Sequence, residues 1–364
     1  MKNRGKTVLA ILLVVIFALL SGCQQAGGVH TDDTKNLVDD NDAERDEEDE
    51  EDDEFDAEAE YAYRDRICDR SVAEGKFACY FLRSNYLRPR PSGVSTSGDA
   101  TLLIAPDGTT MLIDTNMSPV TARVVDYLNR LGVTKLDYLM ISHPDIDHYG
   151  GYAALMHYIE VGHVFISASP DYFNTANKAG RFMELVQEKE IPYTILNSGM
   201  NIAFGEANMK VLWPLAEGEW PKEPNATQIN GGSLVVKFTY GESSFLFGGD
   251  MYVAQEKAVA ELYGEEVQSD IVKMNHHGLK TSNCDQWVEA TNPKLLCGMV
   301  STLKEDEVLK RYMYYDIPFT LSVLDGTCAV YTSGDGVYDV QVERERENTF
   351  FGALETTDGH FRVE

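Results

Sequence analysis

The sequence predicts a mixed α/β fold in which helices cover two β-sheets. Between residues 98 and 342, β-rich apolar runs alternate with segments whose apolar side chains recur at helical spacing. Some neighbouring strands are joined as hairpins, and others are connected through a helix. This mixture of connections favours two layered sheets over a single parallel sheet.

The first part of this region predicts a hairpin followed by a helix. Residues 100–105 and 109–115 are β-rich, and Pro-Asp-Gly between them is a typical turn sequence. Ser118 and Pro119 are suited to begin a helix, because serine caps a helix N-terminus well and proline fits the first turn. The apolar face of this helix comprises Val120, Val124, Leu128 and Leu131.

The remaining elements follow from the same patterns. A strand at residues 135–142 leads into a loop at residues 143–151, and residues 213–232, rich in Pro, Gly and Glu, form the longest predicted loop inside the fold. Further strands are expected at residues 163–169, 193–197, 209–213, 233–240, 243–247, 270–275 and 295–300, with three closing strands near Phe319, Ala329 and Val337. Helices are expected near residues 175–190, 253–263, 282–291 and 304–315.

The N-terminus resembles a bacterial lipoprotein signal. Three basic residues precede an uninterrupted apolar run at residues 8–20, which is too short to remain in a bilayer as a spanning helix. The letters LSGC at residues 20–23 resemble a lipobox, in which the cysteine is diacylated and becomes the mature N-terminus. We therefore expect a signal peptide at residues 1–22 and an extracytoplasmic protein anchored to the bacterial cell membrane by a lipid on Cys23. A signal without a lipid is the alternative.

Much of the acidity lies in a segment that is not expected to fold. The formal charge of the 364-residue chain is −28, and residues 32–60 contain 18 acidic and 2 basic residues. Large apolar side chains are almost absent there, so ordering the backbone would cost entropy without burying area. We expect residues 23–60 to be a solvated tether, with binding of divalent cations or of a basic surface as the alternative. The charge excludes a basic protein that coats nucleic acid.

The rest of the chain divides into three predicted parts. Residues 61–95 form a locally basic N-terminal extension, for which a strand that packs onto the fold is favoured over a ligand site. Residues 96–345 form the main domain, and residues 346–364 form a C-terminal tail.

The cysteines do not form a disulfide or zinc pattern. Five remain after Cys23, an odd number without a CxxC motif. Cys68 and Cys79 could pair outside the membrane, whereas Cys297 and Cys328 lie in apolar runs and are expected in the core.

The strongest functional signal is HPDIDHYGG at residues 143–151, directly after a predicted strand. It contains four potential metal ligands, namely His143, Asp145, Asp147 and His148. A loop that presents two of them to each side could bind two adjacent cations, and the paired glycines allow a tight turn. Taken alone, the segment could also be a loop that caps a helix.

Two further strand ends carry residues of the same types. FGGD places Asp250 after one apolar strand, and NHHG places His276 and His277 after another. Singly, Asp250 could be a helix N-cap and either histidine could be a satisfied core residue. Three strand ends that each present His or Asp are, however, what a site at one edge of a layered α/β fold requires.

In this order, and after the GDATLLIAPDGTTMLIDT hairpin, these motifs resemble the metallo-β-lactamase superfamily over roughly residues 96–342. The resemblance implies a four-layer αββα sandwich with one or two divalent metal ions at the edge between the sheets and a metal-bound hydroxide as the nucleophile. It implies a first metal site made by His143, Asp145 and Asp250. It implies a second metal site made by Asp147, His148, Asp250 and His277.

Two departures from the superfamily pattern point to one branch. Asp145 stands where the usual HxHxDH motif has its second histidine, and residues 170–249 contain no histidine to complete the first site. The pattern instead resembles the hydrolase domain of ComEC-like competence proteins, with a partial resemblance to secreted phosphorylcholine esterases. The ComEC-like signatures imply substrate contacts from Asn230, Ser233, Thr281 and Ser282.

Both of these relatives cleave phosphodiesters, and the expected charges agree with that chemistry. Three aspartates at two divalent ions leave a cluster near neutral once a hydroxide is bound, so a phosphodiester can approach. Zinc is expected first, and the carboxylate-rich first site makes manganese or iron alternatives. Asp147 and His276 are the candidate catalytic residues, His276 as a proton donor or substrate contact. Lys273 and Lys280 could attract an anion, but such lysines are more often merely exposed.

We therefore expect a cell-surface lipoprotein metallo-hydrolase that acts on a small or polymeric phosphodiester. Hydrolysis of lactams, lactones or thioesters by the same hydroxide is the enzymatic alternative. A catalytically silent surface protein that keeps the fold for binding is the alternative from another class. Charge does not favour nucleic acid as the substrate, and the sequence makes no prediction about an oligomer.

Overall fold

The computed structural model describes residues 66–83, 98–175, 179–215, 221–301, 305–346, 356 and 359–364. The chain divides into two units, residues 1–55 and 56–364, and every described residue belongs to the second. The signal peptide, the lipidation site Cys23 and the acidic tether lie outside the described residues, as do residues 61–65 and 84–95 of the extension. Within the described ranges, each helix is too short or too polar to cross a bilayer.

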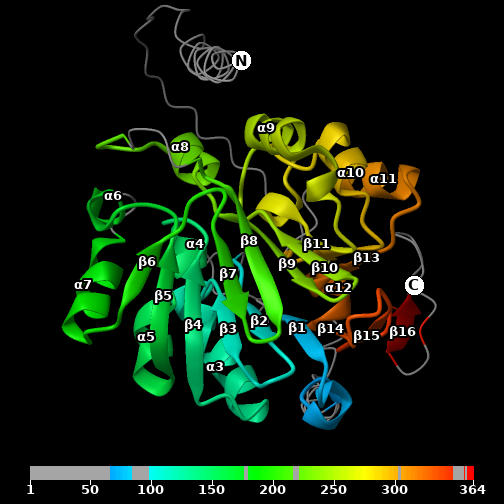
Figure 1. Ribbon diagram of the computed structural model, residues 1–364, viewed down its shortest axis with the longest axis horizontal. Coiled ribbons are helices and arrows are strands. Elements are labelled where there is room, and N and C mark those ends of the chain that lie inside the picture. Colours follow the sequence, from blue (N-terminus) through cyan, green and yellow to red (C-terminus); the bar gives the residue numbers. More distant parts are fainter. Residues whose placement is uncertain are drawn as a thin grey trace, which may run out of the picture. The chain divides into compact units, whose positions relative to one another are not determined.

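Two β-sheets form the centre of the fold (Figure 1). The first sheet contains, in spatial order, β16 (His360–Val363), β15 (Tyr338–Val342), β14 (Cys328–Thr332), β1 (Phe77–Phe81), β2 (Thr101–Ile104), β3 (Thr110–Ile113), β4 (Lys135–Ile141), β5 (Glu160–Ile166) and β6 (Tyr193–Ile195). The second contains β13 (Phe319–Leu321), β12 (Leu295–Gly298), β11 (Ile271–Lys273), β10 (Ser243–Phe247), β9 (Val235–Tyr240), β8 (Ala207–Trp213) and β7 (Asn201–Phe204).

The sheets pack face to face because their strands carry apolar side chains on both faces. In β1, Phe77, Cys79 and Phe81 join a core cluster with side chains of the second sheet, and the alternate residues Ala78 and Tyr80 join the cluster under the helices. Side chains alternate between the two faces of a strand, so a strand buried on both faces needs a continuous apolar run.

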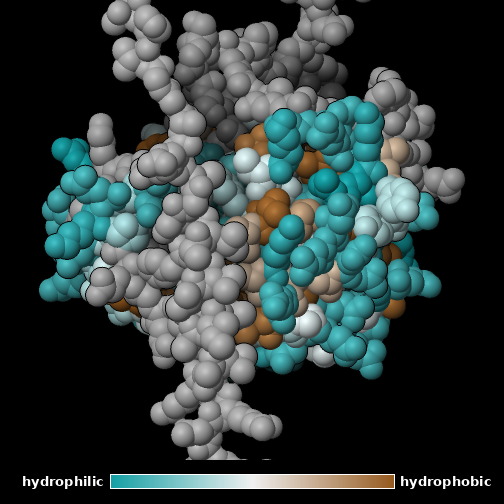
Figure 2. All heavy atoms as spheres, turned by 90° about the horizontal axis from the view of Figure 1, so that it is seen from above, coloured by the Kyte–Doolittle hydropathy of each residue, from teal (hydrophilic) through white to brown (hydrophobic). Residues whose placement is uncertain are grey.

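Helices cover the outer face of each sheet (Figure 1). The first sheet is covered by α3 (Thr121–Arg130), α5 (Tyr152–Tyr158) and α7 (Gly180–Glu188). The second is covered by α9 (Val253–Tyr263), α10 (Asp285–Thr291) and α11 (Asp306–Tyr314). Seen from above, hydrophilic residues cover most of the described surface (Figure 2), as expected for amphipathic helices that bury one face. The αββα sandwich is therefore confirmed.

Short helical segments complete the fold. They are η1 (Arg70–Ala73), η2 (Ser118–Val120), α4 (Ile146–Tyr149), α6 (Pro170–Thr175), α8 (Ala226–Gly231), η3 (Gly264–Val267), η4 (Asn275–Gly278) and α12 (Ser322–Asp325). The loop predicted at residues 213–232 contains the helix α8, which was not expected there. Its start is marked by Asn225 and Gln228, whose side chains and backbone N–H groups form a reciprocal capping box.

Most other elements agree with the sequence prediction. The hairpin β2–β3, the helices α3 and α9 and the closing strands β13, β14 and β15 are confirmed. The helix expected near residues 175–190 begins only at Gly180, after the separate α6, and β7 was not expected. β7 is an edge strand with mostly exposed or half-buried residues, so it lacks a strong apolar pattern.

Two strands of the first sheet come from outside residues 96–345. β1 lies between β14 and β2 and pairs antiparallel with both, so the predicted N-terminal extension supplies an inner strand. β16 lies in the predicted C-terminal tail and pairs antiparallel with β15. The pairing of β1 with β14 cannot be predicted from the local sequence, because the two strands lie near opposite ends of the described chain.

The described cysteines form no disulfide bond with one another. Cys79 is a buried free thiol, so the pairing with Cys68 that the sequence allowed is not formed. Cys297 and Cys328 are buried in the core between the sheets, as expected.

Replacing Phe77 with alanine should test whether β1 is an integral strand. The Phe77 ring is fully buried and lies 5.0 Å from the ring of Phe245 and 6.1 Å from that of Phe204, measured between centroids. We expect a loss of about 3–5 kcal/mol in the free energy of unfolding, measured with urea. The control Tyr158→Ala, at a 66% exposed position, should change it by less than about 0.5 kcal/mol. Equal unfolding midpoints for both variants would contradict an inner position for β1.

Candidate metal centre

The loop after β4 presents its ligand-type side chains through a short helix. The Asp145 carboxylate accepts a hydrogen bond from the N–H of Ile146 (2.7 Å) and caps α4. Asp147 and His148 then lie within the four-residue helix α4. Gly151 packs so closely against the backbone of Thr115 that a Cβ atom would collide with it, which explains the second glycine of the motif.

Asp250 follows β10 across a tight turn. Gly249 has a φ of +55°, and a Cβ there would press on the Ser233 side chain. The Ser233 hydroxyl accepts a hydrogen bond from the Asp250 N–H (3.1 Å). The turn and this bond fix the direction in which the Asp250 carboxylate leaves the strand end.

The histidine pair lies in a strained turn after β11. His276 and His277 both have left-handed backbones, with φ of 49° and 51°. Such a conformation costs a non-glycine residue about 1–3 kcal/mol and persists only where neighbouring contacts enforce it. The N–H of His276 donates to the carbonyl of Gly249 (3.1 Å), and the buried Asn275 side chain donates to Glu256 (2.8 Å).

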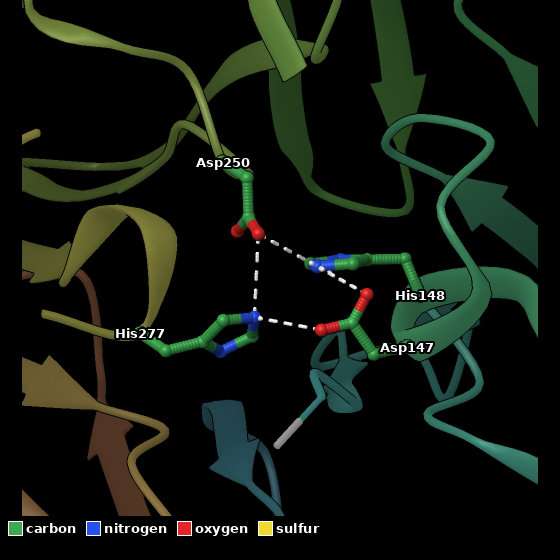
Figure 3. A group of neighbouring side chains, drawn as sticks. All are labelled: Asp147, His148, Asp250 and His277. Atoms are coloured by element: carbon green, nitrogen blue, oxygen red, sulfur yellow. Dashed lines mark ion pairs between the residues drawn. The ribbon is translucent and has the colours of Figure 1, made fainter. Parts of the chain in front are cut away.

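Four side chains from these three strand ends converge on one point (Figure 3). His148 Nε2 lies 3.1 Å from Asp250 Oδ2 and 3.9 Å from Asp147 Oδ1. His277 Nε2 lies 3.3 Å from Asp147 Oδ2 and 3.3 Å from Asp250 Oδ2. One donor atom from each residue lies within 4.8 Å of the others. The second metal site implied by the resemblance therefore consists of side chains that the fold brings together.

This group fits a divalent cation. The Nε2 atoms of His148 and His277 are buried without a hydrogen-bond partner. His148 Nδ1 lies 2.8 Å from the Asp114 carboxylate, which keeps a proton on Nδ1 and leaves Nε2 for an ion. Two imidazoles and two carboxylates are a common ligand set for zinc and for neighbouring transition metals.

In the metal-free chain, protons on the histidines balance the negative charge of the same carboxylates. Burial alone lowers the pKa of His148, but Asp250 and Asp114 outweigh it and hold this pKa well above its ordinary value. Burial likewise lowers the pKa of His277, and Asp250 and Asp99 raise it well above that value. A cation that binds to the Nε2 atoms must therefore displace protons.

The residues implied for the first site are arranged differently. Within the described ranges, the close groups of ligand-type side chains are Asp147, His148, Asp250 and His277, and Asp99, Asp114 and His148. Neither group contains His143 or Asp145. His143 is fully buried with Nδ1 3.0 Å from the Ser142 hydroxyl, and burial lowers its pKa to about 3.

Three further charged residues contact the centre, and the sequence analysis gave no role to two of them, Asp99 and Asp114. Asp114 accepts hydrogen bonds from the N–H and the hydroxyl of Ser142, and Asp99 lies beside His277. Lys273 is only 3% exposed, so the expectation of an exposed lysine is wrong for it, whereas the Lys280 side chain is 68% exposed. Asp114 could have been found from its position at the end of an apolar strand, like Asp250.

The residues expected to contact substrate divide into two kinds. Ser233 and Ser282 are fully buried, and the Ser282 hydroxyl donates to the carbonyl of Met251 (2.7 Å), so both serines support the backbone around Asp250. Asn230 and Thr281 instead contact the His276 ring. The Thr281 hydroxyl lies 2.7 Å from Nδ1 of His276, and Asn230 Nδ2 lies 3.4 Å from its Nε2.

Residues 96–294 match the family model of the metallo-beta-lactamase superfamily. The chain belongs to this superfamily. Its fold and its ligand-type side chains are those of a metal-dependent hydrolase. The resemblance to ComEC-like proteins is also confirmed. The chain is 25% identical over 171 residues to ComE operon protein 3 of Bacillus subtilis (strain 168). The aligned region covers 47% of this chain and 21% of that protein.

A second curated relative gives the same result. Competence protein ComA of Neisseria gonorrhoeae is 25% identical over 187 residues, covering 50% of this chain and 23% of ComA. The chain thus spans about a fifth of the length of the two curated relatives.

Solved structures of the superfamily resemble the fold at low sequence identity. The metallo-beta-lactamase fold protein YhfI of Bacillus subtilis has a TM-score of 0.45 and 10% identity, covering 68% of this chain and 96% of YhfI. A diphosphatase of the PhnP family has a TM-score of 0.39 and 16% identity, covering 64% of this chain and 91% of that chain.

Metal affinity should rise with pH in the neutral range. The raised pKa values of His148 and His277 mean that both imidazoles carry protons in the metal-free chain, and each proton displaced by the ion adds about one unit to the slope of log affinity against pH. Competition with a chelator of known proton affinity between about pH 6 and pH 8 measures this slope. An affinity that does not change over this range would contradict protonated imidazoles in the metal-free chain.

Proposed function

We propose that the protein is a cell-surface metallo-hydrolase that cleaves phosphodiesters. The proposal rests on the convergence of Asp147, His148, Asp250 and His277 at one edge of the two sheets. A divalent cation held there supplies a Lewis acid that lowers the pKa of water and offsets the charge of a phosphate. Zinc is our first candidate, with manganese and iron as alternatives. The sequence resemblance adds a second ion at His143, Asp145 and Asp250.

Two observations favour a phosphodiester among the substrates of the superfamily. The motifs resemble ComEC-like hydrolase domains and phosphorylcholine esterases, and both groups act on phosphodiesters. In addition, the Asn230 amide and the Thr281 hydroxyl provide N–H and O–H groups within one hydrogen-bonded cluster with His276 beside Asp250. Such donors suit the non-bridging oxygens of a phosphate.

Within this proposal, His276 contacts the substrate. Its ring stacks on Tyr252 with centroids 5.1 Å apart, and its Nε2 lies 3.8 Å from Asp250 Oδ2. Burial lowers the pKa of His276, so the neutral ring predominates at neutral pH. A neutral ring fixed on two sides is better suited to orienting a phosphate than to donating a proton.

The alternatives differ in what they require. Hydrolysis of a lactam, lactone or thioester uses the same cation and water but has no need of donors for two phosphate oxygens. A silent binding protein needs no ion, and metal content near zero in the purified chain would favour it.

Asp147→Asn and His277→Ala should each abolish hydrolysis and reduce bound metal while the chain stays folded. The assay combines metal analysis with turnover of bis-aryl phosphate, phosphocholine esters, DNA, lactam and thioester substrates. His157→Ala, an exposed histidine on α5, is the matched control and should keep metal and activity. Full metal content and turnover in both site variants would refute the ligand assignment. The number of ions per wild-type chain tests the second ion.

The same substrate panel tests the substrate class. Residues 61–364 carry about −15, so long DNA meets repulsion that small or zwitterionic phosphodiesters escape, and salt screens this repulsion within about 8 Å at physiological ionic strength. We expect small phosphodiesters to have the higher kcat/KM at low salt. Faster cleavage of DNA that declines as salt rises would move the proposal to a nuclease.

We further propose that Cys23 carries the lipid that holds the protein at the membrane. The proposal rests on the lipobox-like LSGC sequence after a short apolar run. Cys23→Ser should release the chain from the membrane fraction or block its maturation, as measured by fractionation and by the mass of the mature N-terminus. Ser21→Ala, which keeps the cysteine, is the control. Unchanged membrane retention of Cys23→Ser would exclude the lipid as the anchor.

A further inference from the structure

A buried ion pair joins the two sheets next to the candidate metal centre. Asp99 precedes β2 of the first sheet, and Lys273 ends β11 of the second. Both residues are almost completely buried, 2% and 3% exposed, and the Lys273 ammonium contacts the Asp99 carboxylate. A buried lysine beside a cation site requires an explanation, because like charges repel strongly where water is excluded.

Asp99 contacts the ligands through its backbone and its side chain. Its N–H donates to the carbonyl of Asp147 (3.2 Å), and a Cβ atom on the preceding Gly98 would collide with the same carbonyl. His277 Nδ1 lies 3.2 Å from the carbonyl oxygen of Met299 and 3.3 Å from Oδ1 of Asp99, while its Nε2 faces the centre. The Met299 carbonyl favours the His277 tautomer that leaves Nε2 free for an ion, and the Asp99 carboxylate adds a negative charge on the same side of the ring.

Lys273 contacts the loop that carries the fourth ligand. Its ammonium donates to the carbonyl of Gly249 (3.1 Å) and lies 3.7 Å from Oδ1 of Asp250. The opposite oxygen, Oδ2, is the one near His148 and His277. Lys273 therefore holds Oδ1 on the side away from the histidines.

We propose that Asp99 and Lys273 are positioning residues, which hold His277 and Asp250 in the orientation that binds a divalent cation. The proposal rests on the metal centre of the proposed function and adds the pair that shapes it. Removing either partner alone leaves the other charge buried and unpaired, which is strongly destabilising. Partners that orient metal ligands in this way typically contribute a factor of about 10–100 in metal affinity.

The direction in which one substitution changes the metal affinity distinguishes a positioning role from simple charge repulsion. Lys273→Met removes a positive charge next to the site, so Coulomb repulsion alone predicts tighter binding of a divalent cation. Positioning predicts the opposite, because Asp99 and Asp250 lose their common partner. We expect Zn²⁺ and Co²⁺ affinities to fall about 10- to 100-fold and the absorption spectrum of bound Co²⁺ to change.

The experiment uses the full chain in four forms: wild type, Lys273→Met, Asp99→Asn/Lys273→Met and Lys280→Met. The double variant keeps the net charge and removes the unpaired carboxylate, so it is the informative variant if Lys273→Met alone does not fold. Lys280→Met removes an exposed lysine seven residues further along the chain and should leave affinity and spectrum unchanged. Metal affinity is measured by chelator competition, and thermal unfolding of the metal-free chain reports the fold separately.

Each result of the metal-binding experiment leads to one conclusion. Weakened metal binding in the double variant, with a folded metal-free chain, supports the proposal. Metal binding as tight as in the wild type, or tighter, in the folded double variant overturns the proposal. Asp99 and Lys273 would then only compensate each other's charge. A wild-type chain that binds neither ion contradicts the proposed function itself and is distinguishable from both results.

Discussion

Four carboxylates lie close together at one edge of two sheets, and the site depends on how their charge is balanced. Asp99, Asp114, Asp147 and Asp250 are all within reach of His148 or His277. Because burial penalises unpaired charge, this arrangement is stable only with cations among the carboxylates. Imidazolium rings and Lys273 supply them in the metal-free chain, and a divalent ion can replace the protons on the rings.

The two sheets make this density of charge possible. Strand ends from both sheets meet at the same edge, and each contributes one or two side chains from a different part of the chain. The backbone there departs from regular structure, with left-handed residues at His276 and His277 and a glycine turn before Asp250. Strain at these points is held by buried hydrogen bonds such as the one from Asn275 to Glu256. The packed sheets therefore hold the site in a backbone conformation that these residues would not adopt by themselves.

The residues of the superfamily motifs make different kinds of contact in the structure. His148, Asp250 and His277 point their donor atoms at a common centre, whereas Ser233 and Ser282 bind backbone groups around it. Asn230 and Thr281 lie within hydrogen-bond distance of the ring of His276. The motifs group these residues together along the chain, but their contacts divide them into a converging group, backbone supports and neighbours of His276.

The layered α/β architecture and the His and Asp residues at the strand ends could be predicted from the sequence. Both depend on short-range patterns: apolar runs that form buried strands, and His or Asp placed directly after them. Which of these side chains meet depends instead on how the two sheets pack. The tertiary structure brought Asp147, His148, Asp250 and His277 together and left Asp145 capping α4.

The structure also buried Lys273 against Asp99, and it inserted β1 between β14 and β2. These outcomes depend on partners far away in the chain. Burial and pairing are properties of the packed layers, and the local sequence around a lysine or a short apolar strand does not contain them.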